Sequence, residues 1–210
     1  MFKFLLFDLD GTLVDTNEII IRSFEHTLKN HLDYEVERKE IMEIFGEPLF
    51  DQMAHFSADK AEFLCKAYRD FYSNKHLELT RPFPGIKEVL SQLKDQGVTM
   101  AVVTNKSRKF AELGLKDFEL WPYFEYLVAS DDVVQGKPDP EGLFKAMEAI
   151  GASPEETLFL GDSPHDLEAA KNAGIKSGLV SWHIFPENRF EEIQPDYHIH
   201  DINDLMELIK

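Results

Sequence analysis

Two carboxylates stand one residue apart near the beginning of the chain, at Asp8 and Asp10. They follow the apolar run Phe4–Phe7, which is typical of a buried strand, so both acids are expected at the end of that strand and on the same side of it. Two like charges this close are costly unless a cation or a proton lies between them. Gly11 allows a sharp backbone turn directly after the pair. Because a turn alone would need no such acids, we interpret the pair as a metal-assisted reaction centre.

Polar residues also follow three later apolar runs of the chain. These stretches are Thr104–Ser107 after Val102–Val103, Gly136–Pro140 ahead of a helical pattern, and Gly161–Ser163 with Asp166 one helical turn later. In an open parallel sheet the carboxyl ends of the strands border one shared crevice. We therefore expect these stretches, which are far apart in the sequence, to meet the Asp8–Asp10 pair in space.

The elements that must position these residues alternate along most of the chain. Strands are predicted at Lys3–Asp8, Val98–Thr104, Tyr126–Ala129, Thr157–Gly161, Lys176–Val180 and Tyr197–Ile199. Helices are predicted between them at Ile86–Gln96, Ser107–Leu115, Pro140–Ile150 and Pro164–Ala173, with Gly97, Gly151 and Gly174 where three of these helices should end. The alternation predicts an α/β fold, a Rossmann-like parallel sheet with helices on both faces.

A segment from Thr16 to about Thr80 interrupts this alternation. It contains no convincing strand, and its apolar residues recur at helical spacing, as in Ile19–Ile20, Phe24 and Leu28 and again in Phe63, Ala67 and Phe71. We interpret it as a small all-helical domain inserted after the first strand. The predicted domains are thus a core of residues 1–15 and 81–210 and a helical insertion of residues 16–80.

The charge of the chain restricts its partners. The 210 residues carry a formal net charge of −17, which argues against nucleic acids and anionic membranes, because both need a basic surface. A small anionic ligand remains compatible with this charge, because salt screens distant surface charges over about 8–10 Å. Its site would have to be made positive locally, by a metal ion, a lysine and backbone N–H groups.

Cys65 is the only cysteine, so the chain has no internal disulfide, and its apolar neighbours indicate a buried thiol. The apolar run at the start meets Asp8 too soon for a signal peptide, and no later run is long enough to span a bilayer. Together these features predict a cytoplasmic protein. The sequence leaves the oligomeric state open.

The four polar stretches together resemble the haloacid dehalogenase superfamily, in its phosphotransferase branch, over essentially the whole chain. That family's motifs occur here in its order, as Asp8–Thr12, Thr104–Asn105, Lys137–Pro138 and Gly161–Ser163 with Asp166. Each motif alone has an ordinary alternative: a turn, a helix cap or a solvated lysine. Four such motifs in order, at four strand ends, favour the resemblance. The helical insertion lies where this family has its cap domain.

The resemblance implies transfer of a phosphoryl group to the protein and then to water. Asp8 would be the nucleophile and would form an aspartyl phosphate. Asp10 would protonate the leaving oxygen and then deprotonate the attacking water, and the nearby Asp8 charge would help it to begin protonated. Mg²⁺ would be held by Asp8, the backbone carbonyl of Asp10 and Asp162.

The remaining motif residues would bind the phosphoryl oxygens or support those that do. Thr104, the backbone N–H of Asn105 and Lys137 are the expected phosphate ligands. Asp166 is expected to hold a metal-bound water or to orient Lys137 rather than to bind the metal directly. Gly11 and Thr12 complete the first motif as supporting residues.

The resemblance also favours hydrolysis over the other reactions of the family. The family's sugar phosphomutases carry a histidine where this chain has Ile20 and a Ser-Arg pair where it has Pro48–Leu49, so we rank the mutase below a hydrolase. Dehalogenases of the superfamily do not use Mg²⁺, which argues against them here. A receiver-like module that only binds Mg²⁺ or accepts a phosphoryl group is a non-enzymatic alternative, although receivers lack a helical insertion after the first strand.

The start of the insertion and the stretch Gly46–Phe50 look like those of phosphoglycolate phosphatases and the related bacterial inorganic pyrophosphatases, and are closer to the latter. A small phosphate such as phosphoglycolate or pyrophosphate is therefore the expected substrate. Arg22, Glu47 and Pro48 are the candidate specificity residues of the insertion. For Arg22 an ordinary helix ion pair with Glu18, four residues earlier, is the favoured alternative.

Overall fold

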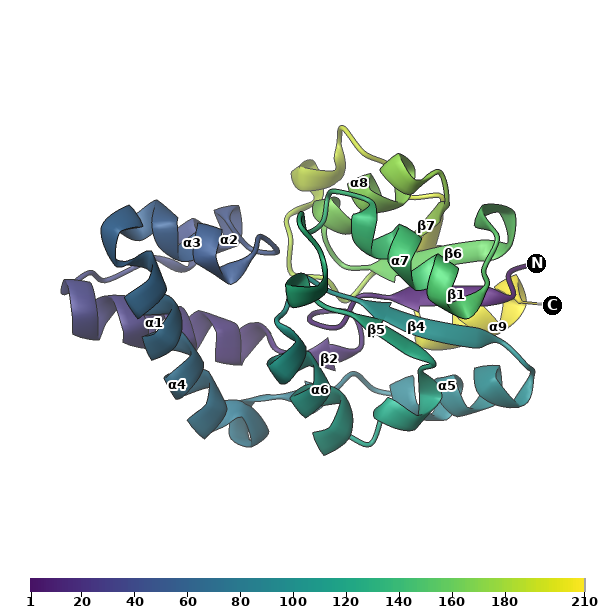
Figure 1. The fold of residues 1–210 in the computed structure, drawn as a ribbon, viewed down its shortest axis with the longest axis horizontal. Helices are drawn as coiled ribbons and strands as arrows, with labels where there is room; N and C mark the ends of the chain where they lie inside the picture. Colours follow the sequence, from purple (N-terminus) through teal and green to yellow (C-terminus); the bar gives the residue numbers. More distant parts are fainter. Residues whose placement is uncertain (210) are drawn as a thin grey trace. The chain divides into compact units, whose positions relative to one another are not determined.

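Six parallel strands form the sheet of the larger of two compact units, which comprises Met1–Val14 and the chain from Pro82 onward. The computed structural model describes residues 1–209 (Figure 1). The strands lie in the order β5-β4-β1-β6-β7-β8. Their bounds are Phe4–Phe7 (β1), Thr99–Val103 (β4), Tyr126–Val128 (β5), Thr157–Gly161 (β6), Lys176–Val180 (β7) and Tyr197–Ile199 (β8). Each of the six predicted strands is present to within one residue at either end, so the predicted α/β fold is confirmed.

The central strand β1 determines where the polar stretches meet. It pairs in parallel with β4 on one side and with β6 on the other, and Phe7 is in register with both Val102 and Leu160. The residues that follow β1, β4 and β6 therefore leave the sheet together at one edge. These residues are the first, second and fourth polar stretches identified in the sequence.

Helices cover both faces of this sheet, and alternate residues of each strand point to opposite faces. Their bounds are Ile86–Asp95 (α5), Arg108–Asp117 (α6), Glu141–Ile150 (α7), Pro164–Ala173 (α8) and Leu205–Leu208 (α9). Leu5 and Phe7 belong to a core with α5 and α6, whereas Leu6 belongs to a second core with α7 and α8. Figure 1 shows α5 and the pair α7 and α8 on opposite sides of the strands. The two cores explain why the strands read as continuous apolar runs.

Two of the predicted helix ends show why glycine stands there. Gly151 and Gly174 are the C-cap residues of α7 and α8, with φ angles of 68° and 71°. Residues with a Cβ are strained in this left-handed conformation, which glycine adopts freely. Both ends confirm the interpretation of these glycines as helix stops.

The second unit, Asp15–Arg81, consists of helices. Their bounds are Asn17–Leu32 (α1), Arg38–Glu43 (α2), Leu49–Phe56 (α3) and Ala61–Leu79 (α4). Helix α4 packs against both α1 and α3. At the two joints between the units, β2 (Val14–Asp15) pairs with β3 (Arg81–Pro82) as a two-stranded sheet. Cys65 of α4 is buried as expected, and burial raises the pKa of its thiol.

The helical spacing of Phe63, Ala67 and Phe71 is confirmed by α4, but the row of residues next to them is the one that faces the core. Phe63 is 53% exposed, while Leu64, Tyr68 and Tyr72 one residue further along are buried. Phe63 instead packs its ring edge-on against His31 of α1 at the surface of the unit. Two adjacent apolar rows, each with a spacing of four residues, run along this helix, and spacing alone does not say which row faces the core.

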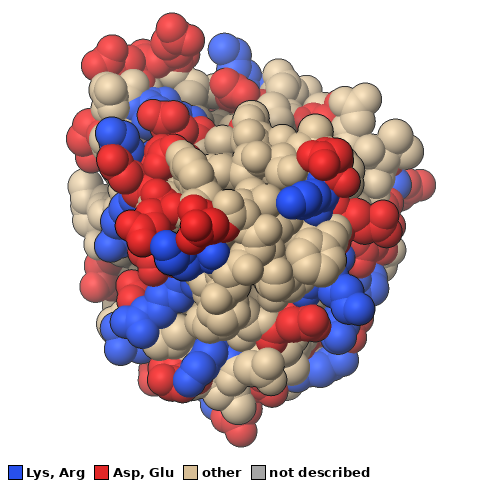
Figure 2. All heavy atoms as spheres, turned by 90° about the vertical axis from the view of Figure 1, so that its left-hand side faces the viewer, with Lys and Arg blue, Asp and Glu red and all other residues tan. Residues whose placement is uncertain are grey.

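Charged side chains of both signs are mixed on the face drawn in Figure 2, around a region without charged groups. Basic residues on this face stand beside acidic ones and form no continuous area. Within residues 1–209, no helix combines the length and the apolar character that crossing a bilayer requires.

Candidate active site

Asp8 occupies the centre of the edge where β1, β4 and β6 end. Its backbone N–H donates to the carbonyl oxygen of Leu160 at 2.8 Å, which continues the pairing of β1 with β6 by one residue. The Asp8 side chain is almost completely buried, at 7% exposed for the whole residue. Gly11 then turns the chain with a φ of 79°, and Trp182 donates its indole N–H to the carbonyl oxygen of Thr12 at 3.2 Å. The loop that carries both acids is thus anchored at each end.

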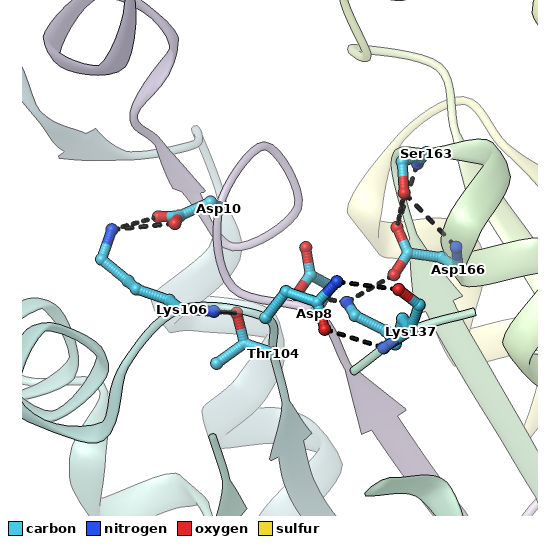
Figure 3. Close-up of polar contacts among 8 residues, drawn as sticks. Asp8, Asp10, Thr104, Lys106, Lys137, Ser163 and Asp166 are labelled. Atoms are coloured by element: carbon cyan, nitrogen blue, oxygen red, sulfur yellow. Dashed lines mark hydrogen bonds and ion pairs between the residues drawn. The ribbon is translucent and has the colours of Figure 1, made fainter. Parts of the chain in front are cut away.

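Lys137 brings two of the polar stretches together. Its ammonium lies 2.7 Å from Oδ1 of Asp8 and donates to Oδ1 of Asp166 at 2.5 Å (Figure 3). All three side chains are buried. A buried lysine is tolerated only when it is paired, so the three charges depend on one another. The structure therefore brings Lys137, Asp8 and Asp166 into contact, and it places Asp166 where it orients Lys137.

Asp166 is held in turn by the first turn of α8. Its Oδ2 accepts from the backbone N–H of Ser163 at 3.0 Å and from the Ser163 hydroxyl at 2.6 Å. The Ser163 hydroxyl accepts from the backbone N–H of Asp166 at 3.3 Å, so the two residues form a capping box. Ser163 is thus the N-cap residue of α8. Both oxygens of Asp166 are engaged, which leaves metal binding mainly to its neighbours.

Asn105 anchors the backbone of Lys137 through its side chain, a role that the sequence interpretation missed. Its amide oxygen accepts from the N–H of Lys137 at 2.8 Å, and its amide nitrogen donates to the carbonyl oxygen of Lys137 at 3.0 Å. A Cβ at Gly136 would lie 2.6 Å from that amide oxygen, so the loop approaches Asn105 closely because position 136 is glycine. Asn105 follows one strand, and Lys137 lies on the loop after another. No sequence spacing relates these two positions.

Asp10 points away from Asp8 to a second lysine. Lys106 donates from its ammonium to Oδ1 and Oδ2 of Asp10 at 2.7 and 2.8 Å (Figure 3). The side chains of Lys106 and Asp10 are 11% and 20% exposed. Thr104, buried at the end of β4, accepts the backbone N–H of Lys106 at 3.2 Å. The sequence interpretation gave Lys106 no role; its position two residues after Thr104 was the available signal.

Burial and crowded charges shift the pKa values of the site. Burial is the main reason that the pKa of Asp8 is raised to about 6, against the opposing effect of Lys137. The pKa of Asp162 is raised well above its ordinary value, first by burial and then by the charges of Asp166 and Asp8. Burial alone would lower the pKa of Lys137, but Asp166 and Asp8 outweigh it and raise that pKa. The site therefore carries more negative charge than one lysine neutralises.

The acids fit a divalent cation. Asp8, Asp162 and Asp166 each offer a carboxylate oxygen, and these oxygens lie within 4.8 Å of one another. Oδ2 of Asp162 is buried and has no hydrogen-bond partner among the described residues. A Cβ at Gly11 would lie only 2.2 Å from this atom, so the Asp162 carboxylate can approach the loop this closely only because residue 11 is glycine. Hard oxygen donors in this number are what Mg²⁺ prefers.

The three candidates of the helical unit have partners within that unit. Arg22 donates to Glu18 at 2.5 Å, and the two side chains are 53% and 47% exposed. Glu47 lies 3.0 Å from Nε2 of His55, and Pro48 is the N-cap residue of α3. The contact of Arg22 is the ordinary helix ion pair that the spacing indicated. Their part in specificity stays a prediction.

Comparisons with known proteins bear on this site. The family model of the haloacid dehalogenase-like hydrolases matches residues 5–180. A pyrophosphatase PpaX of Halalkalibacterium halodurans is 40% identical over 98% of this chain and 95% of its own length, and one of Bacillus mycoides has the same identity and coverage. A solved haloacid dehalogenase-like hydrolase of Streptococcus pneumoniae is 25% identical, with a TM-score of 0.87 over all of this chain and 99% of that one.

Proposed function

This chain belongs to the haloacid dehalogenase-like hydrolases and is a phosphatase, and we propose that it hydrolyses a small phosphate substrate with Mg²⁺ through an aspartyl phosphate on Asp8. The observation that carries the proposal is the setting of Asp8. It is a buried acid at the end of the central strand, paired with Lys137 and close to the carboxylate of Asp162. A strand-end acid held only for stability would not need a second, unpartnered acid beside it.

In the proposed reaction, Asp8 attacks the phosphorus atom and the bond to the leaving oxygen breaks. With a pKa of about 6, Asp8 is ionised at neutral pH and can act as the nucleophile. Asp10 gives its proton to the leaving oxygen and later takes one from the water that attacks the aspartyl phosphate. Lys137, Thr104 and the backbone N–H of Asn105 would bind the phosphoryl oxygens.

The metal would be held by Asp8, Asp162 and the backbone carbonyl of Asp10. When bound, Mg²⁺ supplies positive charge to the phosphoryl oxygens and to the crowded carboxylates. Asp166 keeps Lys137 in place, because one Asp166 oxygen faces the ammonium and the other is held by Ser163. In this proposal, residues of the chain orient the nucleophile and the phosphoryl group. They do so independently of the rest of the substrate.

We propose pyrophosphate as the leading candidate substrate and phosphoglycolate as the next. Relatives named pyrophosphatase PpaX support the former, because they match nearly the whole chain at 40% identity. The resemblance of the helical insertion to phosphoglycolate phosphatases supports the latter. Both are small and anionic, and the proposed location is the cytoplasm, where Cys65 stays a thiol. The alternatives, a sugar phosphomutase and a receiver-like module, lead to different products.

Phosphate release from pyrophosphate, phosphoglycolate and glucose 1-phosphate, with and without Mg²⁺, tests this function. With Mg²⁺ we expect repeated turnover, which is faster for pyrophosphate or phosphoglycolate than for glucose 1-phosphate. The variant Asp8→Asn should show no turnover. Asp95→Asn, at an exposed position on α5, is the matched control. Conversion of glucose 1-phosphate to glucose 6-phosphate would indicate the mutase instead. Phosphorylation without turnover would indicate the receiver-like module.

A further inference from the structure

Two histidines, His198 and His200, lie next to each other at the outer edge of the core sheet. His198 belongs to β8, which is the last strand of the sheet, and His200 directly follows it. Side chains two residues apart on a strand point to the same face. Both imidazoles are exposed, their ring planes differ by 10°, and their ring centroids are 6.2 Å apart. The proposed phosphatase reaction uses neither residue.

The backbone of β8 fixes the spacing of this pair. His198 is in register with Leu179 of β7, and the N–H of Ser181 donates to the carbonyl oxygen of Ile199 at 2.9 Å. Ile199, between the two histidines in the sequence, is buried in the core. The strand is therefore held in place, and only the exposed side chains need to rotate for one nitrogen of each ring to reach a shared ion.

Ser181 is placed to determine which ring nitrogen of His200 is free. The serine hydroxyl lies 2.9 Å from Nδ1 of His200. In a neutral imidazole one nitrogen carries the proton and the other has the lone pair. When Nδ1 donates its proton to the serine oxygen, Nε2 keeps the lone pair that binds a metal ion. A bond of this kind, from the second ring nitrogen to an oxygen atom, accompanies most metal-binding histidines.

Acidic residues flank the two histidines along the chain. Asp196 precedes β8, and Asp201 and Asp204 follow it. Asp196 is paired with Lys176, and Asp204 accepts the backbone N–H groups of His200 and Asp201 at 2.8 and 3.0 Å. The negative charge of these acids attracts a cation to this edge of the sheet. Because Asp196 and Asp204 are already bonded, the two imidazoles are the ligands that the edge offers.

The imidazole nitrogens determine which ions suit this pair. Imidazole binds Zn²⁺, Ni²⁺ and Cu²⁺, whereas Mg²⁺ takes oxygen ligands. A Zn–N bond is about 2.0–2.1 Å long, so two nitrogens at a tetrahedral angle on one ion are roughly 3.3 Å apart. The rings, 6.2 Å apart at their centroids, reach that spacing by tilting toward each other. Because β8 is three strands away from β1, or about 14 Å at the usual strand spacing, this pair is separate from the acids around Asp8.

We propose that His198 and His200 chelate a divalent transition-metal ion, with Zn²⁺ as its representative, through one nitrogen of each ring and with water in the remaining positions. This site lies in the core unit and is independent of the phosphatase reaction. The competing interpretation is that the two histidines are ordinary exposed strand residues, each of which binds such ions weakly and separately. In that case the removal of one ring would leave binding by the other unchanged.

Calorimetric titration with Zn²⁺, in an excess of Mg²⁺ that competes for the acids around Asp8, tests this site. We expect the wild type to bind one Zn²⁺ per chain. His198→Gln and His200→Gln should each bind at least about 100-fold more weakly, because losing a ligand exceeds the 10- to 100-fold cost of losing the group that orients it. Ser181→Ala should bind about tenfold more weakly. His31→Gln, which removes an exposed histidine of α1, is the control and should bind as the wild type does.

X-ray absorption at the zinc edge identifies the ligands in the wild type, where we expect two imidazole nitrogens at about 2.0–2.1 Å. This spectrum decides the question even if a histidine variant does not fold, as judged by circular dichroism. Unchanged Zn²⁺ binding in both histidine variants, or a single imidazole in the spectrum, would overturn the site. Half a Zn²⁺ per chain would also overturn it, because the ion would then join two chains.

Discussion

Lys137 places its ammonium 2.7 Å from the carboxylate of Asp8, with both side chains almost completely enclosed by protein. The two residues are far apart in the sequence and meet because the loop that carries Lys137 is tied to the end of β4 by Asn105. The pair holds the proposed nucleophile in place and supplies the positive charge nearest to it. Its removal should therefore affect activity and stability together.

Lys137→Met should lower kcat/KM about 100- to 1,000-fold, because a charge that stabilises the transferring phosphoryl group is lost. The thermal midpoint of the metal-free variant should also fall, because Asp8 and Asp166 lose their counter-charge. Adding Mg²⁺ should restore part of the midpoint but not the activity. Lys145→Met, which removes an exposed lysine paired with Glu141, is the control and should change the free energy of unfolding by about 0.5 kcal/mol.

The pKa of Asp8 makes a prediction about stability without metal. Its value rises from 3.8 to about 6 on folding, so the folded protein binds more protons than the unfolded chain between these pH values. The contribution of Asp8 to the free energy of unfolding must therefore decrease as the pH rises from about 4 to about 6. Denaturant unfolding in a chelator should show that the wild type loses stability relative to Asp8→Asn over this pH range. The same pH dependence of the free energy of unfolding in the two proteins would contradict the raised pKa.

Gly11→Ala should weaken Mg²⁺ binding at least tenfold, because the new Cβ would lie 2.2 Å from Oδ2 of Asp162 and displace that carboxylate. Gly97→Ala is a matched control. Its φ of 81° imposes the same backbone strain of about 1–2 kcal/mol, but nothing lies within 4 Å of the added Cβ. The thermal midpoint as a function of Mg²⁺ concentration reports the affinity of both variants. A similar affinity for the two would argue against Asp162 as a metal ligand.

Asn105→Ala should lower kcat about tenfold or more with a smaller change in KM, because Lys137 loses both bonds that fix its backbone. The backbone N–H of residue 105, the proposed phosphate ligand, is still present in this variant. Asn172→Ala tests the same loop from another side, since Asn172 donates to the carbonyl oxygen of Pro138 at 3.0 Å. We expect at most a twofold loss there. Equal losses would show that any anchor of the loop matters as much as Asn105.

The sheet and the position of the site follow from sequence because apolar runs and strand ends are local signals. Asp8 and Lys137 could be assigned to strand ends, and parallel strands bring such ends together. The partners of Asn105 and Lys106 could not be predicted from the sequence, because each contact joins two loops whose approach depends on the packed core. The buried face of α4 could not be predicted for a related reason: two rows of apolar residues on this helix have the same spacing, and only the tertiary packing decides between them.

Trapping the phosphorylated enzyme tests the central claim most directly. The protein is mixed with pyrophosphate and Mg²⁺, quenched in acid and reduced with borohydride, which converts an acyl phosphate to an alcohol. Tandem mass spectrometry of the tryptic peptide Phe4–Arg22 then locates the change. We expect reduction at Asp8 in the turning-over enzyme and none in Asp8→Asn. Steady phosphate release with Asp8 unmodified, or reduction at Asp10 instead, would contradict the assignment of Asp8 as the nucleophile.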